Sequence, residues 1–304
     1  EKSVAKISKI RTMAKKHDII WFQSIDSTNE ECRRRISDID NLSVVAALSQ
    51  TSGRGQRGNV WLSEPGQNLT FSIVLKFPVN VMAGELEPMH AYDQFVLSEI
   101  AALSVVDMLA EHDIQAKIKW PNDIYVGDRK ICGMLIENSL RGEWLQHSII
   151  GIGLNVNQRN FDVTLPNPTS MVLCSEFSCA SSGQVASDSV PHYELHELLK
   201  EFMDIFRGYL DRYCNIRGGY GRLRHMYLSH LWRKDEPAQF IDCRTDPRND
   251  YTSCRSFSAS DADANNPPVF TGIIRGLSDI GRLLVEMQDG TMQEFSFKEI
   301  SYII

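Results

Sequence analysis

AKIKWPNDIYVGDRKICGMLIENSLRGEWLQHSIIGIGLN, residues 116–155, is the stretch of sequence that decides the fold. Apolar, β-branched runs alternate in it with short polar or glycine-containing segments, a pattern that predicts a series of strands. The Gly127-Asp128 pair is typical of a hairpin turn between two of them. We therefore expect strands at Ala116–Trp120, Ile124–Val126, Lys130–Glu137 and Trp144–Asn155.

The flanking sequence adds further strands and long helices. Ser43–Leu48 and Leu69–Lys76 are predicted strands, and Tyr92–His112, rich in small and apolar residues, is a predicted helix. Further helices are expected at about His192–Tyr213 and Gly219–Trp232. Helices mixed with antiparallel hairpins indicate the α+β class, with a mixed sheet and flanking helices, rather than a doubly wound α/β fold.

The pattern changes near the C-terminus. From Gln239 onward, short alternating runs surround turns such as Ser278-Asp279, which predicts a small β-barrel-like unit. A chain of 304 residues is long enough for two domains, and we expect them at 1–236 and 237–304. Two polar segments, 175–190 and 243–268, are predicted to be a loose loop and a long insertion.

Composition narrows the function classes. Hydrophobic residues make up 42% of the chain and charged residues 23%, as in an ordinary globular protein, and the net charge of −7 disfavours a general nucleic-acid binder. No apolar run is long enough to cross a membrane, and no signal core precedes Phe22, so a cytoplasmic location is expected. Seven cysteines without a CxxC pair predict reduced thiols rather than a disulfide framework or a zinc knuckle.

A glycine-rich segment, GRGQRG at residues 53–58, spells the GxGxxG fingerprint of dinucleotide-binding folds. That fingerprint needs a helix directly after it, and Pro65 and Gly66 interrupt any helix here. Three glycines instead allow close approach to a ligand, and Arg54 and Arg57 suit phosphate or carboxylate oxygens. Trp61 adds a flat apolar face. The alternative interpretation is a solvated surface loop.

The segment KIKWPND, residues 117–123, ends a predicted strand. Lys119 could stabilise the charge that develops when a carboxylate attacks a phosphate, and Asn122 and Asp123 could hold a ribose hydroxyl or magnesium. The alternative is a plain turn, because Pro-Asn-Asp is common turn chemistry.

Other polar and glycine positions suggest further ligand contacts. The sequence STNE, residues 27–30, fits a capping box and places three small polar side chains where a helix begins. Gly133, together with the glycines of GIGLN at residues 151–155, indicates close approach of a ligand or of another backbone within strands. His192 and His196 lie four residues apart, but no third ligand is evident, and a metal site is not favoured.

Five of these segments together resemble biotin protein ligases in their order and spacing. They are DSTN (26–29), GRGQRGNVW (53–61), KWPND (119–123), RKICG (129–133) and GIGLN (151–155). The resemblance covers about residues 20–160, and GIIRG (272–276) and GRLLV (281–285) are similar to the small C-terminal barrel of the family. It implies a class II synthetase-like biotin/lipoate ligase fold followed by an SH3-like β-barrel.

The resemblance also implies roles for individual residues. Lys119 and Arg54 would be catalytic. ATP or the adenylate would contact Arg57, Trp61, Asn122, Asp123 and Asn155. Biotin would contact Ser27, Thr28, Asn29, Gln50, Gly53, Arg54, Gly55, Gln56, Lys119, Gly133 and Gly153.

The implied activity is that of a biotin–[acetyl-CoA-carboxylase] ligase. Biotin would attack the α-phosphate of ATP, with Mg²⁺ on the phosphates, to form biotinyl-5′-AMP. A lysine of a biotin carboxyl carrier domain would then take the biotinyl group, without a covalent enzyme intermediate. A homodimer is possible, and neither DNA nor a membrane is expected as a partner.

Two departures from the family pattern accompany this expectation. Gln56 and Asn59 stand where the familiar loop carries arginines, so retention of the adenylate would rest more on Arg54 and Lys119. Only about 20 residues precede the predicted catalytic domain, too few for a winged helix, so DNA binding is not expected. A lipoate or octanoate ligase, or a biotin-sensing binding protein without turnover, remains as an alternative.

Overall fold

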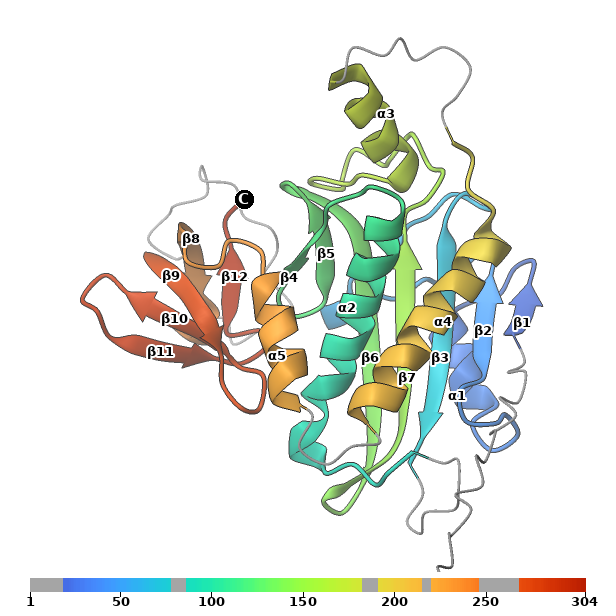
Figure 1. Cartoon of the computed structure of the whole chain (residues 1–304), viewed down its shortest axis with the longest axis horizontal. Helices are drawn as coiled ribbons and strands as arrows, with labels where there is room; N and C mark the ends of the chain where they lie inside the picture. Colours follow the sequence, from blue (N-terminus) through green and yellow to red (C-terminus); the bar gives the residue numbers. More distant parts are fainter. Residues whose placement is uncertain (1–18, 78–85, 182–190, 215–219, 246–267) are drawn as a thin grey trace, which may run out of the picture.

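The computed structural model describes residues 19–77, 86–181, 191–214, 220–245 and 268–304. Its larger part is a seven-stranded sheet in the order β1-β2-β3-β7-β6-β5-β4 (Figure 1). Among the described strands of this sheet, β1 and β2 pair in parallel and the other neighbours pair antiparallel, so the sheet is mixed, as predicted. Its strands are β1 (Ile19–Phe22), β2 (Val44–Ala47), β3 (Leu69–Lys76), β4 (Lys117–Lys119), β5 (Asp123–Val126), β6 (Arg129–Arg141) and β7 (Trp144–Leu154).

Alternation along the central strands divides their side chains between two faces. Val44, Ile73 and Ile150 belong to the large core, whereas Val45, Val74 and Ile149 belong to a small cluster with Cys32 on the opposite face. The small cluster is covered by α1 (Thr28–Arg34), which contacts β2, β3 and β7. The strand register therefore determines which residues meet α1, and α1 carries polar residues of the candidate site.

The large core is covered by α2 (Phe95–Glu111) and α4 (Leu195–Tyr213), which lie across the sheet in Figure 1. Helix α4 buries residues spaced three and four apart, as an amphipathic helix does, and Phe202 packs edge-on against Phe71 of β3. Two further helices complete this part, α3 (Met171–Ser181) and α5 (Tyr220–Ser229). Because α3 extends to Ser181, the prediction of a loose loop over 175–190 is wrong for 175–181, and the remainder lies outside the described residues.

The C-terminal part is a five-stranded antiparallel sheet in the order β11-β10-β9-β8-β12, which confirms the predicted all-β unit. Among the described residues β11 and β12 do not pair, so this sheet is open rather than a closed barrel. The insertion expected at 243–268 lies mostly outside the described residues, and the boundary expected at 236/237 stays a prediction. The strands are β8 (Pro237–Asp242), β9 (Val269–Leu277), β10 (Leu283–Met287), β11 (Met292–Phe295) and β12 (Ile300–Tyr302).

The two sheets share one hydrophobic core. The turn between β9 and β10 inserts against the helical layer, where a Cβ on Gly281 would lie 2.2 Å from the Phe95 ring. The indole of Trp120, buried at the end of β4, donates a hydrogen bond to the Gly281 carbonyl at 2.9 Å. The rings of Trp232 and Tyr302 pack nearby in a tilted arrangement, with centroids 5.6 Å apart. This packing brings the C-terminal sheet beside β4 (Figure 1).

Two expectations from composition concern the state of the cysteines and membrane-spanning helices. Cys32, Cys132, Cys174 and Cys214 are free, but Cys243 is disulfide-bonded, so the expectation of seven reduced thiols is wrong at Cys243. Among the helices of the described residues, none combines the length and apolar character of a membrane span.

Candidate active site

A pocket with about 460 Å³ of open space lies where α1, the glycine-rich loop and strands β6 and β7 meet. It brings together twelve of the residues predicted for the site: Ser27, Thr28, Asn29, Gln50, Arg54, Gly55, Gln56, Trp61, Asn122, Asp123, Gly133 and Gly153. Segments separated by up to about 125 positions in the sequence thus converge on one pocket. The sequence analysis missed four lining residues, Lys130, Met134, Leu135 and Ile152, and marked a fifth, Gly151, only as a strand glycine at a close approach.

One wall of the pocket is a network of hydroxyl and amide groups. The backbone N–H of Thr28 donates to Gln50 Oε1 at 2.8 Å, and Ser72 Oγ lies within hydrogen-bond distance of both Thr28 Oγ1, at 2.7 Å, and Asn29 Oδ1, at 2.6 Å. The amide of Asn29 in turn donates to Glu137 Oε2 at 2.8 Å. These contacts hold the uncharged polar side chains of Thr28 and Asn29 in fixed orientations at the start of α1.

The capping box predicted for STNE does not form. Ser27 is the N-cap residue of α1, but its side chain makes no capping hydrogen bond. Instead Asp26 Oδ1 accepts from the Ser27 backbone N–H at 2.8 Å, and Glu30 pairs with arginines rather than reaching back to the cap. The hydroxyls of Ser27 and Thr28 are thereby left toward the pocket rather than used on the helix backbone.

Three strand glycines make room for side chains of the site. A Cβ on Gly151 would lie 2.2 Å from Asn29 Oδ1, and one on Gly153 would lie 2.3 Å from the indole of Trp61. A Cβ on Gly133 would come within 3.0 Å of the same indole. At these glycines the structure shows close approach of the Asn29 and Trp61 side chains, and close approach of a ligand stays a prediction.

The glycine-rich loop folds back on itself as a narrow hairpin. The backbone N–H of Trp61 donates to the Gly53 carbonyl at 3.0 Å, and that of Gly55 donates to the Asn59 carbonyl at 2.7 Å. A Cβ on Gly53 would meet the Trp61 carbonyl at 2.4 Å, so this crossing requires glycine. Gln56–Gly58 forms a single turn of 3-10 helix at the tip, and the side chain of Arg57 lies outside the described atoms.

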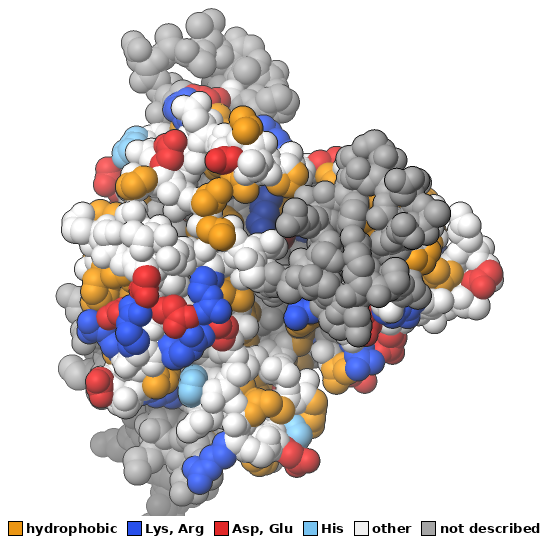
Figure 2. All heavy atoms as spheres, turned by 180° about the vertical axis from the view of Figure 1, so that it is seen from behind, with side chains coloured by type: hydrophobic (Ala, Val, Ile, Leu, Met, Phe, Trp, Pro, Cys, Tyr) orange, Lys and Arg blue, Asp and Glu red, His pale blue; other side chains and the backbone are white. Residues whose placement is uncertain are grey.

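Arg54 projects from this loop to the rim of the pocket, where it forms an ion pair with Glu30 of α1. Its guanidinium also lies 3.9 Å from Glu137 of β6. Basic and acidic side chains gather on this face of the molecule (Figure 2). Arg34, for example, makes two 2.7 Å hydrogen bonds to Asp26, which hold the pKa of that carboxyl well below its usual range.

Lys119, predicted to be catalytic, is not among the described residues that line the pocket. Its ammonium lies over the rings of Tyr125, Tyr302 and Trp232, at 4.8, 5.0 and 5.8 Å from their centroids. It donates to the Tyr125 hydroxyl at 3.1 Å, and burial lowers its pKa to about 8. The structure therefore places Lys119 in an aromatic cage between β4, β5 and β12.

Lys130 is the lysine that reaches the pocket. Its Nζ lies 2.8 Å from Asp123 Oδ1 and 5.8 Å from the centroid of the Trp61 ring. The reason is a β-bulge: Ile124 pairs with Cys132 and Tyr125 with Lys130, which leaves Ile131 without a register partner in β5. The extra residue turns Lys130 to the side of Gly133, whose Cβ would lie 3.1 Å from Lys130 Nζ.

Three further predicted residues differ in how they contribute to the pocket. Asn122 lines it and donates to the Met134 carbonyl at 2.5 Å. Asn155, by contrast, is buried behind it and donates to the Thr169 carbonyl at 2.9 Å, so it joins the end of β7 to the chain before α3. Gly53 supports the loop without lining the pocket. The ring of His196, which was considered as a metal ligand, packs in a tilted arrangement against Trp21, with centroids 4.1 Å apart.

Comparison with known proteins agrees with this geometry. Residues 21–155 match the sequence profile of the Biotin/lipoate A/B protein ligase family. The human biotin–protein ligase is 33% identical over 53% of this chain and 22% of that protein, and the bifunctional ligase/repressor BirA of Escherichia coli is 31% identical over 47% and 42%. The biotin–[acetyl-CoA-carboxylase] ligase of Paracoccus denitrificans is 28% identical over 70% and 80%.

The similarity extends to three-dimensional structure. The biotin protein ligase of Aquifex aeolicus, in complex with biotin and ATP, superposes with a TM-score of 0.64 at 23% identity, over 93% of this chain and 97% of that one. The chain spans less than half of the lengths of the human and Escherichia coli relatives, 22% and 42%. From the matched segment, and from the side chains that it contributes to the pocket, we conclude that residues 21–155 form a domain of the Biotin/lipoate A/B protein ligase family.

Proposed function

We propose that this protein activates biotin with ATP to biotinyl-5′-AMP and transfers the biotinyl group to a lysine of a biotin carboxyl carrier domain. The observation that carries the proposal is the composition of the single pocket described above. It joins a wall of oriented hydroxyl and amide groups to two cationic side chains, Arg54 and Lys130, and to the flat indole of Trp61.

The polar wall suits the ureido ring of biotin. A ureido group presents two N–H donors and one carbonyl acceptor, and Ser27, Thr28 and Asn29 offer both kinds of partner. The alkyl chain of octanoate, or the dithiolane of lipoate, would leave these polar groups unpaired in the complex. Unpaired buried polar groups disfavour such ligands strongly, so the wall supports biotin over lipoate or octanoate.

The cationic side chains suit the reacting end of the substrates. In the first step a biotin carboxylate oxygen attacks the α-phosphorus of ATP, and pyrophosphate leaves. We propose that Lys130, held by Asp123, takes the charge-stabilising role that the sequence suggested for Lys119, and that Arg54 binds the carboxylate and α-phosphate. Both groups act by position and charge, without a covalent bond to the enzyme.

Trp61 is proposed to cover the adenylate. Its buried Nε1–H has no hydrogen-bond partner among the described residues, so it is available to a ligand oxygen. Magnesium would enter on the ATP phosphates, and Asp123 is the only carboxylate among the described lining residues that could join its ligands. When bound, the metal would neutralise phosphate charge.

In the second step the amine of the carrier lysine attacks the carbonyl carbon of the mixed anhydride, and AMP leaves. The partner that we propose is therefore a biotin carboxyl carrier domain of acetyl-CoA carboxylase or of a related carboxylase.

We also propose that the protein acts in the cytoplasm and that it forms a homodimer. Light scattering of the purified protein tests whether it is a homodimer. Titration of the thiols of protein isolated under anaerobic conditions tests whether the Cys243 disulfide exists in the compartment where the protein acts.

Exchange of labelled pyrophosphate into ATP tests the proposal, run separately with biotin, lipoate and octanoate. Exchange that depends on biotin alone is the expected result. Exchange with lipoate or octanoate would assign the protein to another activity of the same family. Measurable biotin binding without exchange would contradict turnover and indicate a biotin-sensing protein.

A further inference from the structure

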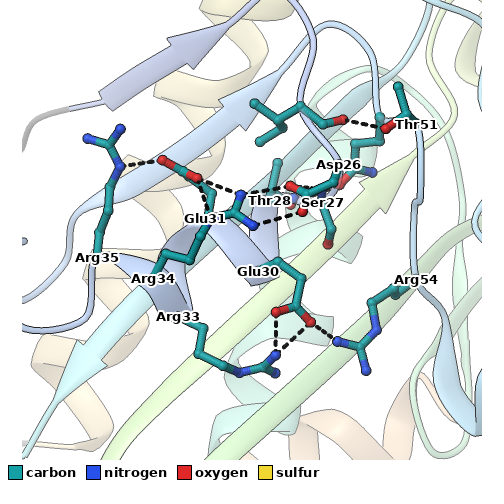
Figure 3. A network of polar contacts seen from close by, with 12 residues as sticks. Asp26, Ser27, Thr28, Glu30, Glu31, Arg33, Arg34, Arg35, Thr51 and Arg54 are labelled. Atoms are coloured by element: carbon teal, nitrogen blue, oxygen red, sulfur yellow. Dashed lines mark hydrogen bonds and ion pairs between the residues drawn. The ribbon is translucent and has the colours of Figure 1, made fainter.

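Arg54 is already occupied by carboxylates of the protein itself. Figure 3 shows Glu30 between Arg33 and Arg54, with both guanidinium groups directed at the same carboxylate. Glu137 on β6 is a second acid of this group, 2.8 Å from Arg33 and 3.9 Å from Arg54. The arginine that would meet the ligand anion is thus held at the pocket rim by two acids that do not line the pocket.

The two arginines differ in how completely they are held. Arg33 makes two 2.6 Å contacts with Glu30 and a 2.8 Å contact with Glu137, so it satisfies both acids by itself. Arg54 has its close contact only with Glu30. If Arg54 turned into the pocket, Arg33 would still neutralise Glu30 and Glu137, and neither carboxylate would be left without a cationic partner. Release of Arg54 is therefore less costly than release of Arg33.

The network also reaches the polar wall. Glu137 accepts the 2.8 Å hydrogen bond from Asn29, so one carboxylate orients a wall amide and faces Arg54 at the same time. Hydrogen bonds from Arg33 hold the pKa of Glu30 below its usual value, and Glu30 remains a full negative charge at neutral pH. A permanent internal anion consequently competes with any ligand anion for Arg54.

We propose that Glu30, with Glu137, is an internal counter-anion that holds Arg54 until the biotin carboxylate or the adenylate phosphate displaces it. Arg33 is the residue that makes this exchange possible, because it keeps the vacated acids paired. This inference rests on the proposed function, and it identifies Glu30 and Arg33 as positioning residues that set how tightly anionic ligands are retained. Neither residue touches the ligand.

The two residues should then act with opposite signs, which a merely structural role would not produce. In Glu30→Gln, Arg54 loses its competing anion, and we expect biotinyl-5′-AMP to dissociate about fivefold more slowly, the size of one partly exposed ion pair. In Arg33→Gln, Glu30 and Glu137 depend on Arg54 alone, and we expect dissociation to be about fivefold faster.

The experiment measures dissociation of biotinyl-5′-AMP from the full chain by stopped-flow tryptophan fluorescence, with biotin amide as a probe that keeps the ring and lacks the anion. Biotin amide should bind both variants like the wild type. Glu31→Gln is the matched control, because Glu31 lies on the same helix but pairs with Arg34 and Arg35, and its rate should not change. Circular dichroism confirms that each variant is folded.

Three results would overturn the proposal: equal rates in Glu30→Gln and wild type, a change of the same sign in Glu30→Gln and Arg33→Gln, or an equal effect of Glu31→Gln. Failure of the proposed function has a different signature. A wild type that neither binds biotinyl-5′-AMP nor catalyses biotin-dependent pyrophosphate exchange would overturn both ideas, whereas normal exchange with unchanged Glu30→Gln rates would overturn only this inference.

Discussion

Lys119 on β4 and Lys130 on β6 lie on either side of strand β5. The surroundings of their ammonium groups differ, and so do the ligands that each can contact. Three aromatic rings surround the ammonium of Lys119, and its close polar partner among the described residues is the Tyr125 hydroxyl. The ammonium of Lys130 faces the pocket and pairs with a carboxylate. Only the second arrangement leaves a cation available to a phosphate.

Lys130→Met should therefore slow the adenylation step by about 10²–10³, the usual loss when one preorganised electrostatic group is removed from an active site. Single-turnover formation of biotinyl-5′-AMP measures the effect. Lys119→Met, which removes the same charge from the neighbouring cage, is the comparison and should remain within a few-fold of wild type. Comparable losses in both variants would mean that the cage, too, contributes to the chemistry.

The cage has a pH signature of its own. The folded-state pKa of Lys119, lowered to about 8 by burial, lies below its unfolded value of 10.5. Between these values the unfolded chain binds the extra proton, so this residue's contribution to stability rises with pH from about 8 to 10.5. The free energy of unfolding of the wild type, relative to Lys119→Met, should increase over that range. A pH-independent difference would show that Lys119 is not desolvated.

Single residues also show what sequence could predict about the site. Ser27, Thr28 and Asn29 were predictable because small polar residues cluster where a helix starts. The position of Lys119 outside the pocket was not predictable, because Tyr302, which closes its aromatic cage, lies 183 positions away in a different sheet. A local pattern contains no information on such a contact.

At the scale of the element, the bulge at Ile131 decides which lysine serves the pocket. Simple alternation places Lys130 and Gly133 on opposite faces of β6, whereas the bulge places both beside the pocket. Strand positions were predicted well because β-branched runs are distinctive. Bulges were not, because a bulge depends on the pairing register with the next strand and not on the residues of one strand.

The glycines of β6 and β7 give a second prediction at this scale. Gly153→Ala would place a methyl group 2.3 Å from the Trp61 indole and should displace that ring from the pocket. Overpacking typically costs about 1–3 kcal/mol, so kcat/KM for biotin should fall by about tenfold or more. Gly208→Ala on α4 is the control, because its added Cβ would meet no atom outside its own helix backbone within 4 Å. This variant should leave kcat/KM unchanged. Equal kinetics in the two variants would place Trp61 away from the reaction.

At the scale of the whole molecule, Arg224 of α5 joins the helical layer to the C-terminal sheet. It pairs with Glu99, which is fully buried in α2, and donates to the Ser278 carbonyl at 2.6 Å in the turn between β9 and β10. Burial raises the pKa of Glu99 to about 7, so this carboxylate depends on its partner to remain charged. The pair therefore fastens the second sheet onto the core of the first.

Arg224→Met should lower the free energy of unfolding by about 3–5 kcal/mol at pH 8, because it leaves a buried carboxylate unpaired. The loss should shrink toward pH 6, where Glu99 can take up a proton. Glu99→Gln combined with Arg224→Met removes both charges and should recover most of the stability. Urea denaturation at the two pH values measures all three, and a double variant no better than the single one would contradict the account.

Much of the large-scale architecture was predictable from the sequence. The mixed sheet and the all-β C-terminal part follow from apolar periodicity and turn residues such as Gly281 and Gly290. What could not be predicted is how the parts meet: Gly281 packs against Phe95, and the C-terminal sheet remains open between β11 and β12. Such contacts depend on three-dimensional packing between segments far apart in the chain.

The most direct test of the central claim, that this pocket forms biotinyl-5′-AMP with Lys130 as its charge-stabilising residue, uses ATP labelled in the α-phosphate. The protein is mixed with biotin and labelled ATP, quenched with acid, and the products are separated. We predict label in biotinyl-5′-AMP for the wild type and Lys119→Met, and almost none for Lys130→Met. If the wild type formed no labelled biotinyl-5′-AMP, or if Lys130→Met formed as much of it as the wild type, the account would be contradicted.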